Sequence, residues 1–137
     1  MIKLKDLILE MEEDEPLTDL NGEVKRLELS LKIEFPQLSD LYMYIRSSGD
    51  LYLNSLRVKP NYRGKGIGHK VMERIIEFAD KHDLYLTLYP SAEPRYKEKL
   101  KQFYKSFGLK PNKGRKTLYQ YSNPFHILWI KRPKSKD

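Results

Sequence analysis

The stretch Val58 to Met72, VKPNYRGKGIGHKVM, joins three kinds of local structure. The apolar run Leu51 to Val58 has the composition of a strand, and it stops at Lys59-Pro60-Asn61. Three glycines follow within five residues, Gly64, Gly66 and Gly68. An amphipathic helical pattern then begins. The stretch therefore predicts a strand, a loop and the start of a helix.

The glycine loop suits an anionic ligand. Glycine lacks a Cβ, so backbone N–H groups can approach a ligand closely, and a helix start adds unpaired donors and the positive end of the helix dipole. Arg63 and Lys65 add charges that suit phosphate oxygens. The segment Arg63 to Gly68 thus favours a pyrophosphate site. Judged by the number of glycines alone, a turn that binds no ligand and leaves its basic residues in solvent is an equally good interpretation.

Two motifs in this chain resemble those of one family. Arg63-x-x-Gly66-x-Gly68 resembles the Arg/Gln-x-x-Gly-x-Gly/Ala signature of the GNAT family, the GCN5-related N-acetyltransferases. Downstream, Phe103 to Leu109 reads FYKSFGL and is similar to the FYxxxGF ending of that family. The two motifs stand in the right order, and the resemblance extends roughly from Leu41 to Leu109.

The resemblance implies a fold and a reaction. The fold class is α/β (α+β), with a mixed, mostly antiparallel central sheet of about six to seven strands flanked by helices and a splayed parallel pair at the cofactor site. The implied reaction is transfer of an acetyl group from acetyl-CoA, as co-substrate, to a primary amine by direct attack in a ternary complex. The acceptor, a small molecule or a protein, is not indicated.

The same resemblance assigns roles to individual residues. The pyrophosphate would rest on the loop Arg63, Gly64, Lys65, Gly66, Ile67 and Gly68. The pantetheine arm would run along the backbone of Leu56, Arg57 and Val58, where an N–H could also serve as an oxyanion donor. Tyr104 would protonate the departing thiolate. Without the motif, Tyr104 would be read as one of ten tyrosines that merely pack.

The chain departs from the family pattern at the acceptor side. No carboxylate base stands out, because Asp50 reads as a turn residue and His69 as a surface residue or phosphate neighbour. Lys97 and Leu100 stand where many members have Asn and Ala. A non-catalytic CoA- or polyanion-binding module of the same fold is therefore an alternative. Several strand aromatics could line an acceptor cleft or simply pack: Tyr42, Tyr44, Tyr52, Tyr119 and Trp129.

Composition limits the class of protein. The 137 residues suit one domain, 1–137, with residues 131–137 expected to be a frayed basic tail. There is no cysteine, no run as long as a membrane span and no signal peptide, so a cytoplasmic protein without membrane association is expected. Residues 1–23 carry a net charge of −6 and the remainder +13, which makes nucleic acid a possible but not favoured partner. A homodimer paired through the C-terminal strands is also possible.

Periodicity predicts the remaining elements. Alternating apolar residues make Val24 to Phe35 the clearest expected strand, preceded by a turn at Asn21-Gly22. The other expectations are a helix over Ile2 to Met11, strands over Leu41 to Arg46, Leu51 to Val58 and Leu84 to Tyr89, a helix after the glycine loop, a helix over Arg95 to Phe107 with Gly108 as its cap, a loop over Pro111 to Arg115, and a hairpin of Thr117 to Tyr121 with Phe125 to Ile130.

Overall fold

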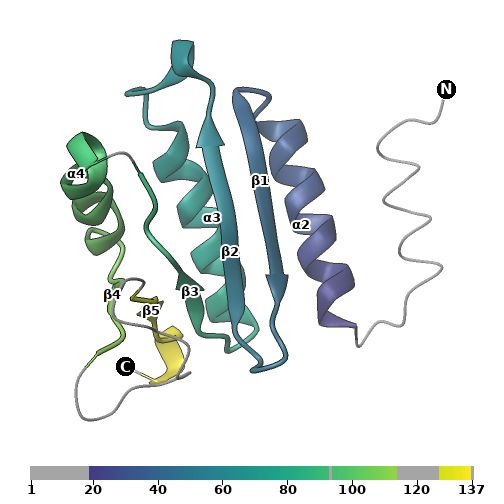
Figure 1. The fold of residues 1–137 in the computed structure, drawn as a ribbon. Coiled ribbons are helices and arrows are strands. Elements are labelled where there is room, and N and C mark those ends of the chain that lie inside the picture. The colour runs from purple at the N-terminus through teal and green to yellow at the C-terminus, as the bar shows by residue number, and fades with distance from the viewer. Residues whose placement is uncertain (1–18, 93, 114–126, 137) are drawn as a thin grey trace, which may run out of the picture.

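A computed structural model describes residues 19–92, 94–113 and 127–136, and its elements form one five-stranded sheet with flanking helices (Figure 1). The elements in chain order are α2 (Leu20–Glu34), β1 (Leu38–Ile45), β2 (Leu51–Val58), η1 (Pro60–Tyr62), α3 (Ile67–Lys81), β3 (Leu86–Leu88), α4 (Pro94–Lys105), β4 (Lys110–Pro111), β5 (Trp129–Lys131) and η2 (Lys134–Lys136). None of the described helices combines the length and the apolar character that crossing a bilayer would need.

The sheet has the strand order β1-β2-β3-β5-β4. Among the described strands only β2 and β3 are parallel, whereas the β1–β2, β3–β5 and β4–β5 pairs are antiparallel. The expected mixed, mostly antiparallel fold with one parallel pair is confirmed, although the described residues supply five strands rather than six or seven. The predicted strand Thr117 to Tyr121 and the predicted helix Ile2 to Met11 lie outside the described residues.

One hydrophobic core joins the helices to one face of the sheet. In the middle of β1 and at the start of β2 every second side chain is buried, whereas all three residues of the central strand β3 are buried. In Figure 1, α3 lies behind the sheet and α2 runs along the outer edge of β1. The buried core residues of these elements are Val24, Leu31, Leu41, Met43, Leu51, Leu53, Val71, Met72, Ile75, Ala79, Leu86 and Leu88.

The prediction of a strand over Val24 to Phe35 is wrong, because this segment is helix α2. Its buried positions, Val24, Glu28 and Leu31, follow helical spacing, and Ile33 at the end of the apparent alternation is 47% exposed. The predicted turn at Asn21-Gly22 is instead the first turn of the helix. Asp19 caps it by accepting a hydrogen bond from the Asn21 N–H at 3.0 Å.

Helix α2 also satisfies the outer edge of β1. The buried Glu28 carboxylate accepts the Met43 N–H at 3.0 Å, and the Asn21 side-chain oxygen accepts the Ile45 N–H at 3.0 Å. Both N–H groups belong to the edge strand of the sheet. A helix that covers an edge in this way prevents pairing with another chain. Glu28 and Asn21 are therefore structural residues of α2.

The C-terminal tail is docked rather than frayed over residues 131–136, so that expectation is wrong. Its Lys134 N–H donates to Asp80 Oδ1 at 2.9 Å, and Lys131 Nζ lies 3.7 Å from the same carboxylate oxygen. The Ser135 hydroxyl bonds Asp83. These contacts hold the tail against the C-terminal end of α3.

Three element boundaries also differ from expectation. The predicted loop from Pro111 begins inside a strand, because Lys110 and Pro111 form β4 against β5. The predicted strand Leu84 to Tyr89 is shortened to Leu86–Leu88, and the second helix runs over Pro94–Lys105. Gly108 has a φ of +94°, which fits the expected cap position after that helix.

Asp50 is fully buried and binds three side chains at the β1–β2 turn. Arg46 donates to Asp50 Oδ2 through Nε at 2.8 Å and Nη2 at 2.5 Å, and the hydroxyls of Ser48 and Thr87 also donate to the carboxylate. Burial alone would raise the pKa of Asp50, but these hydrogen bonds and the Arg46 charge lower it below the ordinary 3.8. The network ties the turn to β3.

We expect Asp50→Ala to lower the free energy of unfolding by about 3 kcal/mol at pH 7, because it leaves Arg46 without its buried partner. A lowered folded-state pKa means that this stability is present above the ordinary carboxyl pKa and is lost as pH falls through the lowered value. Urea unfolding should therefore show the variant approaching the parent near pH 2. Asp40→Ala, on the exposed side of the same hairpin, should change stability by less than about 0.5 kcal/mol. An equal loss in both variants would contradict this role.

Candidate functional site

The parallel strands β2 and β3 part before β2 ends. Their pairs run from Leu51 with Leu86 to Leu53 with Leu88, whereas β2 continues to Val58. After β3 the chain turns away from β2 toward α4 (Figure 1). The β3-facing backbone of residues 54–58 therefore has no strand partner among the described elements, and its N–H and C=O groups can serve a ligand.

A bulge in β2 marks the point where the two strands part. Tyr42 pairs with Ser55 and Met43 pairs with Leu53, so Asn54 has no partner in β1. The side chains facing the core shift from Leu51 and Leu53 before the bulge to Leu56 after it. An extra residue of this kind bends the strand and redirects its backbone groups. The alternation of Leu51 to Val58 gave no sign of it.

The glycine loop leads into α3 through two left-handed residues. Gly64 has a φ of +78°, and Gly66, the residue that precedes the first turn of α3, has a φ of +79°. No side chain caps this helix start, so the first N–H groups of α3 are not taken by a side-chain cap. A Cβ added at either glycine would meet nothing within 4 Å. The loop thus presents backbone donors beside open space.

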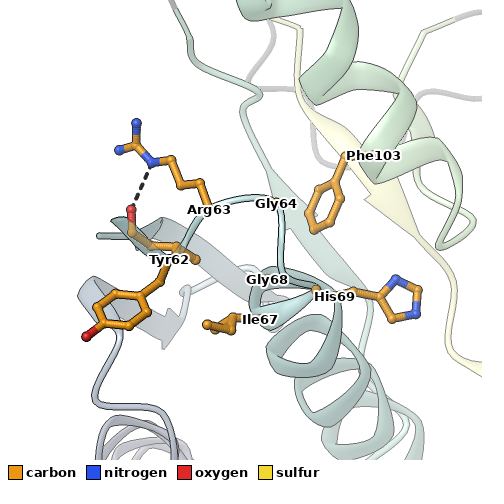
Figure 2. Close-up of a pocket in the computed structure, with 9 residues that line it drawn as sticks. Tyr62, Arg63, Gly64, Ile67, Gly68, His69 and Phe103 are labelled. Carbon is orange, nitrogen blue, oxygen red and sulfur yellow. Dashed lines mark hydrogen bonds between the residues drawn. The ribbon is translucent and has the colours of Figure 1, made fainter. Parts of the chain in front are cut away.

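A pocket of about 420 Å³ lies at this helix start (Figure 2). Figure 2 shows the Phe103 ring of α4 on one side and Tyr62 with Ile67 on the other. The ring of Phe103 approaches closely, since a Cβ on Gly68 would lie 3.5 Å from its Cζ atom. The described residues that line the pocket include no carboxylate: Val58, Tyr62, Arg63, Gly64, Gly66, Ile67, Gly68, His69 and Phe103.

Arg63 fastens the loop to the end of β2. Its Nε donates to the Val58 carbonyl at 2.9 Å, the contact drawn as a dashed line in Figure 2. The guanidinium therefore holds the loop and places a positive charge at the pocket rim. Lys65 does not line the pocket, and its Nζ lies 5.7 Å from the centre of the Tyr62 ring.

His69 is a pocket residue on the first turn of α3. Its Nε2 lies 2.7 Å from Glu73 Oε1, one helical turn further on, and its ring centre lies 4.8 Å from that of Phe107 on the segment after α4. These two contacts fix the ring at the pocket wall. That His69 neighbours a phosphate stays a prediction.

Tyr104 lies in the core rather than in the pocket wall. It is 8% exposed, and its ring centre lies 5.3 Å from that of Phe103, which does line the pocket. Burial raises the pKa of Tyr104 to about 12. The phenol is therefore protonated at any physiological pH.

The structure gathers six of the ten residues expected at the site around one pocket: Val58, Arg63, Gly64, Gly66, Ile67 and Gly68. Leu56, Arg57, Lys65 and Tyr104 do not line it. Two lining residues were missed as contacts, Tyr62 and Phe103, whereas His69 was named as a surface residue or phosphate neighbour. Phe103 could have been predicted as a contact, because it directly precedes Tyr104 in the FYKSFGL motif. In the structure its ring faces the start of α3.

The pocket fits a pyrophosphate-bearing ligand. Its volume falls within the range of small-molecule sites, and a helix start with adjacent Arg63 and His69 suits an anion. The two left-handed glycines leave the space a phosphate would need. Among the described residues, no cluster of three or more His, Asp or Glu could hold a metal ion.

The chain matches the model of a protein family. The profile of the "Acetyltransferase (GNAT) domain" matches residues 38–111, which is more than half of the chain. No curated protein sequence matches the chain significantly.

Solved structures share the fold at low identity. A putative GNAT-family acetyltransferase from Desulfovibrio desulfuricans is 14% identical with a TM-score of 0.50, covering 92% of this chain and 90% of that one. Naa50 from Arabidopsis thaliana, in complex with a bisubstrate analogue, is 22% identical (TM-score 0.45, 66% and 60% covered). The ribosomal-protein-S18-alanine N-acetyltransferase of Escherichia coli is 20% identical (TM-score 0.48, 67% and 59% covered). The match thus spans about 60% of the length of the latter two proteins.

Proposed function

Because the chain belongs to the GNAT acetyltransferase family, we propose that it transfers the acetyl group of acetyl-CoA to a primary amine. The observation that carries the proposal is the pocket at the start of α3, which includes Val58 at the end of the β2 segment that has no partner in β3. This arrangement offers an anion site and a free strand backbone side by side. A pyrophosphate and an extended amide chain, the two parts of CoA, need that combination.

In this proposal the backbone of the loop and of α3 binds the pyrophosphate. The N–H groups at Ile67, Gly68 and His69 provide the donors, and Arg63 and Lys65 provide positive charge. The β3-facing backbone of Leu56, Arg57 and Val58 would hold the pantetheine arm. Because the Arg63 side chain already occupies the Val58 carbonyl, the arm would use the remaining groups of that segment.

Acetyl-CoA supplies the acetyl group as a thioester, and the amine nitrogen forms the new C–N bond as the C–S bond breaks. A backbone N–H beside the Asn54 bulge would stabilise the negative charge on the thioester oxygen. Tyr104 would donate a proton to the departing thiolate, whose thiol has a reference pKa of about 8.5. The acceptor ammonium, with a reference pKa of about 10.4, would first lose one proton to water, since no carboxylate is among the described residues that line the pocket, and it would attack as the neutral amine. The second proton that the nitrogen loses after the attack would restore the protonated phenol of Tyr104.

A non-catalytic CoA-binding module is the second candidate. It is favoured by the burial of Tyr104 away from the pocket wall and by the lack of a carboxylate base there. Turnover separates the two candidates. Purified protein incubated with acetyl-CoA and a panel of primary amines should release free thiol and add acetyl to one of them. Binding of acetyl-CoA without thiol release across the panel would favour the module.

We further propose a cytoplasmic setting and a possible homodimer. The cytoplasmic setting rests on the cysteine-free sequence, which needs no oxidising compartment. The dimer would form at β4, which is the last strand in the order of the described sheet. Light scattering at several concentrations tests for the dimer.

A further inference from the structure

Four tyrosines form a continuous row across the sheet, here called the tyrosine row: Tyr42, Tyr44, Tyr52 and Tyr89. Ring centres lie 5.4 Å apart from Tyr42 to Tyr44, 5.5 Å from Tyr44 to Tyr52 and 6.1 Å from Tyr52 to Tyr89. Such tilted and edge-on pairs stabilise one another. The row therefore spans β1, β2 and the end of β3 as one aromatic surface.

The row occupies the sheet face turned away from the core. Tyr42 and Tyr44 alternate along β1 with buried Leu41 and Met43, so they point to the opposite side. In Figure 1, α3 lies behind the sheet, and no helix of the described segments crosses in front of β1 and β2. Tyr42 is 48% exposed. A large aromatic surface thus faces away from the helices.

The tyrosine row reaches the point where β2 and β3 part at Tyr89, and its other end on β1 lies at the same level of the sheet. Tyr89 directly follows Leu88, which belongs to the last parallel pair. Tyr42 pairs with Ser55, the first residue beyond the Asn54 bulge. A group resting on this surface would consequently lie next to the opening in which the proposed function places the thioester.

The row is aromatic and without net charge. Arg46 lies 5.0 Å from the centre of the Tyr52 ring, but buried Asp50 neutralises its charge. Burial, followed by the neighbouring Tyr44 and Tyr89 hydroxyls, raises the pKa of Tyr52, so its phenol is neutral at pH 7. Outside residues 1–23 the chain carries a net charge of +13, which opposes polycationic acceptors. An aromatic group matches this surface better than a polyamine does.

We infer that the tyrosine row is the acceptor-binding surface and that the acceptor is a primary amine carrying an aromatic ring. The inference rests on the proposed function and narrows its substrate class. The ring would pack on Tyr42 and Tyr44 while the amine reaches the opening beside Asn54.

The test compares 2-phenylethylamine with 2-cyclohexylethylamine, which has similar size but no aromatic ring. We expect kcat/KM to be about 10-fold higher for the aromatic amine. In Tyr42→Leu, KM for the aromatic amine should rise about 10-fold with kcat and acetyl-CoA affinity unchanged. Tyr96→Leu is the matched control, because Tyr96 is 50% exposed on α4 and outside the row. Equal kcat/KM for the two amines, or equal effects of the two variants, would overturn the inference.

If neither amine is turned over, a binding experiment tests whether the tyrosine row binds the acceptor. The probe is N-acetyl-2-phenylethylamine, titrated by calorimetry into protein saturated with CoA. Binding that weakens in Tyr42→Leu and not in Tyr96→Leu supports the inference. No binding to the CoA-saturated protein overturns it while leaving the proposed function intact, whereas failure of CoA itself to bind overturns the proposed function. Dimerisation that is lost in Tyr42→Leu would assign the row to a second copy of the chain and overturn the inference too.

Discussion

Acetyl-CoA is expected to bind about 100-fold more weakly to a Gly66→Val variant than to the parent protein. Gly66 has a φ of +79° and lines the pocket, and an added side chain there would fill open space rather than meet protein. A β-branched residue in this conformation is strained, so the loop would also shift. Loss of two hydrogen bonds to a charged phosphate, at about 1.5 kcal/mol each, corresponds to this factor.

Gly49→Val is the matched control for the loop variant. Gly49 also has a positive φ, +92°, and open space around its Cβ position, but it lies in the β1–β2 turn away from the pocket. Both variants should lower the melting temperature by similar amounts, while only Gly66→Val weakens acetyl-CoA binding. Calorimetric titration of both proteins measures the difference. If the folded Gly66→Val variant binds acetyl-CoA as tightly as the parent protein does, the glycine loop is not part of the binding site.

Tyr104→Phe is expected to lower kcat about 100-fold while leaving acetyl-CoA affinity unchanged. That factor is at the lower end of what a general acid contributes, which suits a leaving thiolate of moderate basicity. Phenylalanine keeps the ring that packs against Phe103 in the core, so the fold should survive. Steady-state kinetics with a saturating acceptor measures the effect.

The pH dependence gives a second test of Tyr104. Its pKa of about 12 means that the phenol stays protonated, and able to donate, up to that pH. The parent kcat should therefore show no loss attributable to a tyrosine near pH 10, the ordinary value. Tyr96→Phe on the exposed face of α4 is the control for a general effect of losing a hydroxyl. Unchanged kcat in Tyr104→Phe would assign this tyrosine to core packing alone.

The central part of the fold could be predicted from the sequence because local signals and tertiary packing agree there. Each local pattern there corresponds to one element. The apolar run Leu51 to Val58 is strand β2, with the predicted bounds, and the amphipathic pattern after the glycines is helix α3. The family motifs covered the same region. Six expected residues consequently lie around one pocket, although their contacts with a ligand stay a proposal.

The segment Val24 to Phe35 shows why the spacing of apolar residues predicted the wrong element elsewhere in the chain. Leucines at alternate positions also satisfy a broad helical face, and Glu28 looked like a solvent-facing residue of a strand. In the structure Glu28 is buried because its carboxylate accepts the Met43 N–H of the sheet edge. That contact joins residues 15 apart in sequence. No pattern within the segment could reveal such a partner.

The finer geometry of the site also could not be predicted from the sequence. The Asn54 bulge depends on the register of β1 against β2, and the approach of Phe103 to Gly68 depends on how α4 packs near α3. The C-terminal tail was expected to fray because it is charged, yet Asp80 and Asp83 at the end of α3 bind it. Each of these features comes from contacts between distant segments.

Calorimetric titration of the purified parent protein with acetyl-CoA shows whether the glycine loop binds CoA. We expect saturable binding with a micromolar Kd, abolished in an Arg63→Ala, Gly66→Asp double variant that removes the loop anchor and places a carboxylate in the pocket. Circular dichroism on the same samples establishes that both proteins are folded. A folded parent protein that gives no heat of binding and no shift in melting temperature with millimolar acetyl-CoA would show that this protein is not an acetyl-CoA-dependent transferase.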